Sequence, residues 1–391
     1  MFPSRDALTE LYIGLMSGTS LDGVDAVLAD FDTYPPKLIA NQYLPYPQEL
    51  RAQLLALQNA GTNEMHNAAI VGNELTYLYT QTIADLLEKA GVHSISVRAI
   101  GCHGQTIRHN PRDGYTLQLC NPALLAELSG ISVVADFRSR DVAAGGQGAP
   151  LVPAFHNAVF RSSTIHRIIL NVGGIANVTS LKPGCSTFGF DTGPGNMLLD
   201  AWVQWHTGRA FDDGGRWAAS GHLIPRLLDS LLAHPFFALA PPKSCGREQF
   251  NIDWLKANLS GGESEQDVQA TVLGLSATSI VSAIERWCGT PEELIICGGG
   301  ARNATLMGRL SSFLPTTRVL TSDTLGYGTD WVEAMAFAWL ARQALLGLPR
   351  QPSRSHRSQG RSHLRGNLPR LRKKGATAPL CLKLLGRWPI R

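Results

Sequence analysis

Residues able to bind phosphate and a divalent metal ion are concentrated in one short segment near the N-terminus. The apolar segments 12–16 and 26–29 flank the run Gly18-Thr19-Ser20-Leu21-Asp22-Gly23-Val24-Asp25. A tight turn between strands exposes backbone N–H groups and hydroxyls that suit phosphate oxygens, and carboxylates such as Asp22 and Asp25 bind Mg²⁺, mostly through water. The segment predicts a phosphate and Mg²⁺ site. A plain β-hairpin whose glycines only satisfy turn geometry would show the same pattern.

Two further glycine clusters follow strand-like segments. Gly173-Gly174 lies between the strand-like segments 167–172 and 175–179, and this run repeats the strand–turn–strand pattern with Asn171 in place of Asp. Gly298-Gly299-Gly300-Ala301-Arg302-Asn303 follows a third apolar segment. Neither a Walker motif nor a Rossmann fingerprint is present. The repetition predicts an α/β protein with two duplicated lobes, each of which begins with a phosphate-facing hairpin.

The elements that position these clusters are predicted from hydrophobic spacing. Strands are expected at 97–101, 115–119 and 131–135, with the polar segment 102–106 as a loop after the first of them. Helices are expected at 63–90, 122–128, 268–287, 304–313 and 331–346. The segment 136–150 is charged and then rich in glycine. A loop of this length inside a domain is usually functional.

The composition is that of a globular protein, with 44% apolar and 17% charged residues in a chain of 391. Seven scattered cysteines without a C-x-x-C pair indicate reduced thiols in a cytosol, and neither a signal peptide nor a membrane span is expected. Residues 348–391 contain twelve Lys or Arg and no acids, whereas the rest of the chain has a net charge of −8. This tail is expected to be disordered. A nucleic-acid-binding tail and a shifted reading frame are the alternatives for it.

The motifs occur in an order that resembles bacterial anhydro-N-acetylmuramic acid kinases, over residues 11 to about 349. The segments that carry the resemblance are 15–23, 103–106, 136–138, 143–153, 189–196, 298–300 and 333–337. The resemblance implies a two-lobed actin-like ATPase with ribonuclease-H-like βββαβαβα lobes and ATP in the cleft between them. The lobes would be residues 1–165 and 166–349, followed by the tail 350–391. Residues after Leu348-Pro349 differ from the usual end of the family, which puts the last strand in doubt.

The resemblance also implies a reaction, a location and an assembly. The enzyme would convert 1,6-anhydro-N-acetylmuramic acid, ATP and water into N-acetylmuramic acid 6-phosphate and ADP, in the cytoplasm, for peptidoglycan recycling. The expected ligands are ATP, Mg²⁺ and the sugar, with no nucleic acid or membrane, and the expected assembly is a homodimer. A non-catalytic nucleotide-binding protein of the same fold is the main alternative.

The catalytic and sugar-binding candidates are assigned by combining the motifs with their chemistry. Asp191, between a strand-like segment and the turn 192–196, would take a proton from the attacking water, as in inverting glycosidases. An N-cap for the next helix is its structural alternative. Glu333 would contact the sugar or serve only as a first-turn acid of its helix. Gln105, Thr106 and Arg138 are expected to bind the substrate, with His103 as a structural hydrogen-bonding group. The residues expected to bind the nucleotide are Gly18 to Asp25, Asn171, Gly173, Gly174, Gly298, Gly299, Gly300 and Asn303.

Overall fold

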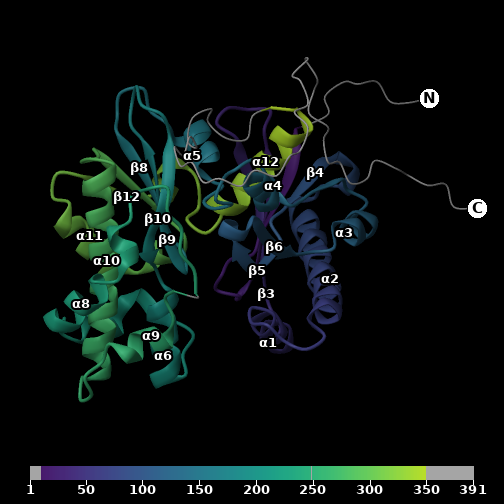
Figure 1. Cartoon of the computed structure of the whole chain (residues 1–391). Coiled ribbons are helices and arrows are strands. Elements are labelled where there is room, and N and C mark those ends of the chain that lie inside the picture. Colours follow the sequence, from purple (N-terminus) through teal and green to yellow (C-terminus); the bar gives the residue numbers. More distant parts are fainter. Residues whose placement is uncertain (1–9, 248, 349–391) are drawn as a thin grey trace, which may run out of the picture.

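Each of the two lobes of the protein is built around a five-stranded sheet, and the two sheets have corresponding strand orders (Figure 1). The structure is a computed structural model, and it describes residues 10–247 and 249–348. Within these ranges the sheets have the orders β3-β2-β1-β4-β7 and β10-β9-β8-β11-β12, and a two-stranded sheet pairs β5 with β6. In each five-stranded sheet the first three strands are antiparallel neighbours, and the last two pair in parallel. This confirms the predicted duplication of an α/β fold.

The five strands of the main sheet follow one another in the same way in both halves, with different additional elements between them. The first half contains β1 (Leu11–Met16), β2 (Gly23–Asp30), β3 (Lys37–Pro45), α1 (Gln48–Ala56), α2 (Glu64–Ala90), β4 (Val97–Cys102), β5 (Gln105–Asn110), β6 (Tyr115–Leu119), α3 (Pro122–Ser129), β7 (Val133–Val134), α4 (Phe137–Ala143) and α5 (Pro153–Phe160). The second half contains β8 (Arg167–Val172), β9 (Ile175–Leu181), β10 (Phe188–Pro194), α6 (Met197–Thr207), α7 (Arg216–Ala219), α8 (Pro225–Leu232), α9 (Ile252–Ala257), α10 (Glu265–Trp287), β11 (Glu293–Cys297), α11 (Ala304–Phe313), β12 (Arg318–Thr321) and α12 (Val332–Leu345).

Three sequence predictions of local structure are wrong in part. The segment 136–150 is not one long loop, because α4 forms within it. The strand expected at 131–135 is reduced to the two-residue strand β7, which pairs with β4. The polar segment after β4 is short, because Gln105 already begins β5.

Helix α12 joins the two halves. It packs against β1, β2 and β4 of the first sheet, although it follows the strands of the second sheet in the chain. Its buried side chains share one hydrophobic cluster with Met16 of the first sheet and with Ile169 and Ile295 of the second. The helix can lie this close because Gly14 and Gly101 have no side chain, and a Cβ on Gly14 would lie 1.8 Å from the Ala334 carbonyl oxygen. The boundary drawn at residue 165 stays a prediction.

Helix α10 is the core helix of the second lobe. It is long and apolar enough to cross a membrane by length and composition, but 83% of its most apolar window is buried inside the protein. Its buried residues pack into the large cluster formed with β8, β10 and α6. The predicted tail 350–391 lies outside the described residues.

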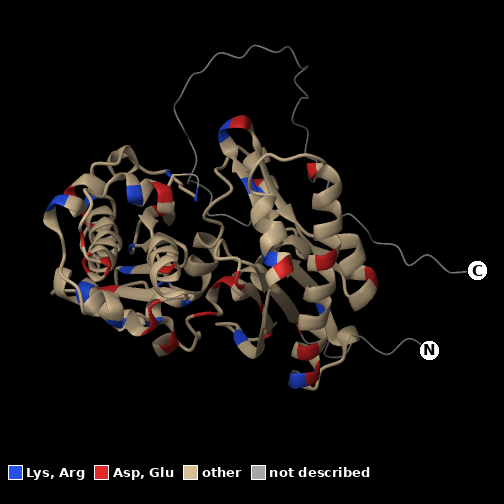
Figure 2. Ribbon diagram, turned by 90° about the horizontal axis from the view of Figure 1, so that it is seen from below, with Lys and Arg blue, Asp and Glu red and all other residues tan. Residues whose placement is uncertain are grey.

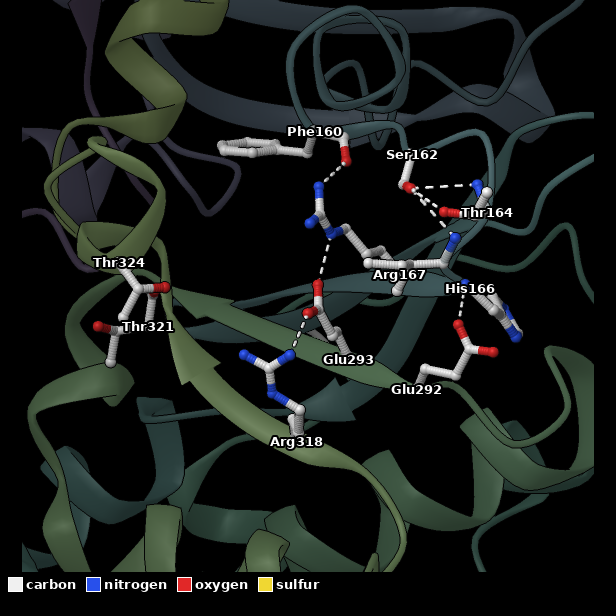
Figure 3. A network of polar contacts seen from close by, with 11 residues as sticks. Phe160, Ser162, Thr164, His166, Arg167, Glu292, Glu293, Arg318, Thr321 and Thr324 are labelled. Atoms are coloured by element: carbon white, nitrogen blue, oxygen red, sulfur yellow. Dashed lines mark hydrogen bonds and ion pairs between the residues drawn. The ribbon is translucent and has the colours of Figure 1, made fainter.

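A polar network fastens the beginning of the second sheet to the end of α5 (Figure 3). The Glu293 carboxylate on β11 accepts hydrogen bonds from Arg167 Nε on β8 at 2.6 Å and from Arg318 Nη1 on β12 at 3.1 Å. Arg167 Nη1 also donates to the Phe160 carbonyl oxygen at 3.0 Å. Because the Glu293 side chain is 5% exposed, this network replaces the water that the buried carboxylate loses on folding.

Candidate active site

A cavity of about 1610 Å³ lies between the two lobes. Segments of both sheets contribute to its wall, and acidic residues gather on loops between the lobes (Figure 2). The sequence-predicted residues that line it are Gly18, Thr19, Ser20, Asp22, Asp25, Thr106, Arg138, Asn171, Gly173, Gly174, Asp191, Gly298, Gly299, Asn303 and Glu333. The topology thus brings most of the candidates to one place, from segments more than 300 positions apart in the chain.

The two predicted phosphate turns face each other across this cavity. The first lies between β1 and β2, where Ser20 Oγ donates to Asp22 Oδ1 at 2.8 Å. The second lies between β8 and β9, and a Cβ added to its Gly174 would lie 2.9 Å from Thr19 Oγ1 of the first. The missing side chain of Gly174 therefore lets the two turns approach each other closely, and a larger residue there would displace the Thr19 hydroxyl. The turns leave backbone and hydroxyl groups from both lobes on the same cavity.

The third glycine cluster packs against the end of β8. Gly298 has a φ of +80°, and a Cβ there would lie 2.4 Å from Asn171 Oδ1. A Cβ on Gly300 would lie 2.3 Å from Val172 Cγ1. Asn303 caps α11, since its Oδ1 accepts from the Leu306 N–H at 3.0 Å. Gly298, Gly299 and Asn303 line the cavity. Gly300 does not line it and packs against Val172 instead, so it shapes the turn.

Four of the residues proposed to bind nucleotide are not part of the cavity wall: Leu21, Gly23, Val24 and Gly300. Leu21 and Val24 bury their side chains in the core of the first lobe. Leu21 also adopts a φ of 57°, which turns the chain between Gly18 and Asp22. Leu21, Gly23 and Val24 thus shape the first turn, and any contact that they make with a nucleotide would come from the backbone.

Asp191 is held on the cavity wall by a neighbouring loop. It lies inside β10, beside an irregularity in the pairing with β9, and not in a turn after the strand. Bulges of this kind re-aim a side chain. Its Oδ2 accepts from the Cys245 N–H at 3.0 Å, its own N–H donates to the Lys243 carbonyl oxygen at 3.1 Å, and it is 5% exposed. The N-cap alternative is wrong, because Asn196 occupies the N-cap position of α6.

Glu333 and Arg138 are oppositely charged residues that line the same cavity as Asp191. Glu333 lies in the first turn of α12, and burial raises its pKa, while Arg138 and a hydrogen bond from Asn171 lower it. Burial lowers the pKa of Arg138, whereas the carboxylates of Glu333 and Asp191 raise it. Arg138 Nε donates to His103 Nε2 at 2.8 Å and its Nη1 donates to the Gly148 carbonyl oxygen at 2.7 Å. His103 thus serves as a hydrogen-bonding group, and the 136–150 segment fixes the arginine.

Carboxylates are crowded beside the first turn. Burial, together with the neighbouring charges of Asp22, Asp330 and Glu333, raises the pKa of Asp25 to about 8. Within the described ranges, no group of three or more His, Cys, Asp or Glu side chains is arranged to hold a metal ion by itself. Mg²⁺ usually keeps several waters and binds one or two carboxylates together with nucleotide phosphates. The crowded carboxylates of Asp22 and Asp25 fit that mode of binding, since a cation there would relieve their repulsion.

Gln105 has a different position from the one expected for a substrate ligand. It is fully buried behind the cavity wall, where its Nε2 donates to the Gly18 carbonyl oxygen at 3.0 Å. Its Oε1 accepts from Tyr46 Oη at 3.2 Å. Both ends of the amide are used within the protein, so this residue supports the first phosphate turn. Thr106 does line the cavity.

Sequence reasoning missed several polar residues on the cavity. Lys243, Cys245 and Arg247 come from the irregular segment before α9, and Asp200 comes from α6. The pKa of Asp200 is raised to about 7, mainly by burial and also by the charge of Asp22, while Arg247 opposes the shift. Asp200 reads as an ordinary first-turn acid, and the other three lie in a stretch with no periodicity. No local signal would have identified them.

Two lobes of one topology, with glycine turns, crowded carboxylates and a held aspartate on the cavity between them, are typical of the two-lobed actin-like ATPases and sugar kinases. The comparisons with known proteins narrow this class. The family model described as anhydro-N-acetylmuramic acid kinase matches residues 10–366. Two curated proteins named anhydro-N-acetylmuramic acid kinase, from Nitrosospira multiformis and Nitrosomonas europaea, are each 55% identical over 340 residues. These matches cover 86% of this chain and 93% and 94% of the relatives.

The chain belongs to the anhydro-N-acetylmuramic acid kinase family, and it is an ATP-dependent kinase. The family match continues to residue 366, beyond the end at about 349 that the motifs indicated. Among solved structures, a ROK family glucokinase from Streptomyces griseus in complex with glucose and AMPPNP is 13% identical, with a TM-score of 0.42. The match covers 85% of this chain and 99% of that one.

Proposed function

We propose that the protein opens the internal bond of 1,6-anhydro-N-acetylmuramic acid with water and phosphorylates the freed O6 with ATP, as a step of peptidoglycan recycling. The observation that carries the proposal is the position of Asp191. A held carboxylate lies on the same cavity as two glycine turns suited to phosphate. A simple sugar kinase needs only to activate a hydroxyl, whereas this substrate needs a water at C1 as well.

Asp191 would accept a proton from the water as the water oxygen forms a bond to C1. The C1–O6 bond then breaks, and O6 bonds to the γ-phosphorus as the bond between that phosphorus and the ADP oxygen breaks. The phosphoryl group thus takes the place of the proton that a general acid gives in ordinary inverting hydrolysis. The atoms balance as N-acetylmuramic acid 6-phosphate and ADP, with one proton left on Asp191 and then lost to water.

The remaining residues would bind and orient the two substrates. Thr19, Ser20 and the backbone of Gly173 and Gly174 would bind phosphate oxygens, and Arg138 and Thr106 would contact the sugar. Mg²⁺ held through water by Asp22 and Asp25 would supply charge neutralisation on the phosphates. Glu333 would contact the sugar near Arg138. The homodimer and the cytoplasmic location stay predictions.

The test is a product analysis with the full chain. ADP release and sugar phosphate are measured together, with MgATP and either 1,6-anhydro-N-acetylmuramic acid or ring-opened N-acetylmuramic acid. We expect one ADP for each N-acetylmuramic acid 6-phosphate with the anhydro sugar, and little turnover with the ring-opened one. ATP turnover that does not respond to the anhydro sugar would indicate a nucleotide-binding protein of another function.

A further inference from the structure

The segment from Lys243 to Arg247 connects the two sides of the cavity. It belongs to the second lobe, just before α9, and lines the cavity along its length. At one end it is hydrogen-bonded to Asp191, through the Lys243 carbonyl oxygen and the Cys245 N–H. Two residues further on, Arg247 reaches the first lobe. The segment that holds Asp191, the proposed base, therefore also carries the positively charged side chain of Arg247.

Arg247 is anchored on the first phosphate turn. Its Nε donates to the Thr19 carbonyl oxygen at 2.9 Å, a contact between residues 228 positions apart. The side chain is partly buried on the cavity wall. Burial and the charge of Arg51 lower the pKa of Arg247, whereas the carboxylates of Asp200 and Asp22 raise it. A cation thus lies beside the turn that faces Gly174 of the second lobe.

The anchoring leaves the outer part of the guanidinium available. Within residues 10–247 and 249–348, no hydrogen bond or ion pair engages its two Nη groups. An arginine fixed through Nε presents both Nη groups in one plane, a geometry that matches two oxygens of a phosphate. A lysine at this position would offer a point charge without that fork.

We propose that Arg247 binds the terminal phosphoryl group of the bound nucleotide. This inference rests on the proposed function, which sets the sugar O6 as the acceptor of that group. In that reaction the γ-phosphorus must meet O6 of the same sugar whose C1 is attacked by the water on Asp191. Arg247 lies two residues after Cys245, whose N–H holds Asp191. It is therefore placed to bind the end of the triphosphate that lies nearest to the base. There it stabilises the charge on the transferred group.

Nucleotide affinity without sugar tests this assignment. Dissociation constants for ATP, ADP and AMP with Mg²⁺ are measured by calorimetry on the full chain, its Arg247→Ala and Arg247→Lys variants, and Arg226→Ala. Arg226 is an exposed arginine of the same lobe, bonded to Glu263 and away from the cavity. Loss of a charge-assisted contact to the γ-phosphate should weaken ATP about 10- to 100-fold in Arg247→Ala. ADP should change less, AMP should not change, and Arg247→Lys should recover part of the loss.

The outcomes separate this inference from the proposed function. Equal weakening of all three nucleotides, or none, in an Arg247→Ala protein that melts like the wild type would overturn it. Weakened sugar binding with unchanged ATP binding would also overturn it, and would assign Arg247 to the sugar carboxylate. If the wild type prefers ATP through Arg247 but never phosphorylates the anhydro sugar, the proposed function fails and the phosphate contact stands.

Discussion

The packing of α12 on the first sheet makes Gly14→Ala a sharp test of how the fold positions Glu333. A Cβ at this position would lie 1.8 Å from the Ala334 carbonyl oxygen and 2.7 Å from the Ala338 nitrogen, both backbone atoms. Relief requires α12 to move by about 1 Å, and overpacking of this kind costs about 3 kcal/mol when backbone must shift. Because Glu333 is one residue before Ala334, the same shift moves its carboxylate. A displacement of that size in an active site can lower kcat about 100-fold.

The assay is urea denaturation together with kcat for the same purified proteins. Gly72→Ala is the matched control, because Gly72 lies within α2 with nothing within 4 Å of an added Cβ. It should leave kcat unchanged and raise the free energy of unfolding by up to about 1 kcal/mol, since alanine favours a helix more than glycine does. Wild-type stability and kcat in Gly14→Ala would refute the close packing of α12 on β1.

Two other predictions concern stability. Glu293→Ala should lower the free energy of unfolding by about 3 kcal/mol, because it leaves Arg167 partly buried without its carboxylate. Arg318→Ala, whose side chain is 70% exposed, should cost less than about 1 kcal/mol, and equal losses in the two variants would contradict the network. Burial lowers the pKa of His156 to about 3, so its stability contribution is complete above the unfolded pKa of about 6.5 and declines as the pH falls toward 3. Relative to His156→Asn, the wild type should lose about 2 kcal/mol between pH 7 and pH 5 in urea titrations, and a pH-independent difference would contradict a neutral buried imidazole.

The strands and turns of the site were predictable because their signals are local. Glycine between apolar segments identifies the turns near Gly18 and Gly174, and this signal does not depend on residues elsewhere in the chain. The long helices α2 and α10 follow from apolar spacing. Asp191 was singled out correctly as a cavity residue, but the strand continues through it because β9 supplies a partner on one side.

The parts that sequence could not supply depend on contacts between distant segments. Helix α12 has an apolar pattern that suits either lobe. Its place is fixed by Gly14 on β1 and Gly101 on β4, which are far from it in the sequence. Gln105 reads as a polar ligand, yet its partners are a buried tyrosine and a turn carbonyl. Arg247 meets Thr19 only in the folded protein.

The activity of Asp191→Asn tests the central claim most directly. The substitution keeps the shape of the side chain and an oxygen for the Cys245 N–H, but removes a carboxylate that can take a proton from water. We predict that kcat for formation of N-acetylmuramic acid 6-phosphate falls by about 100- to 10,000-fold, the usual contribution of a general base. ATP affinity and melting temperature should stay at the wild-type values. A variant that folds, binds ATP and still converts the anhydro sugar within a few-fold of the wild-type rate would contradict the account.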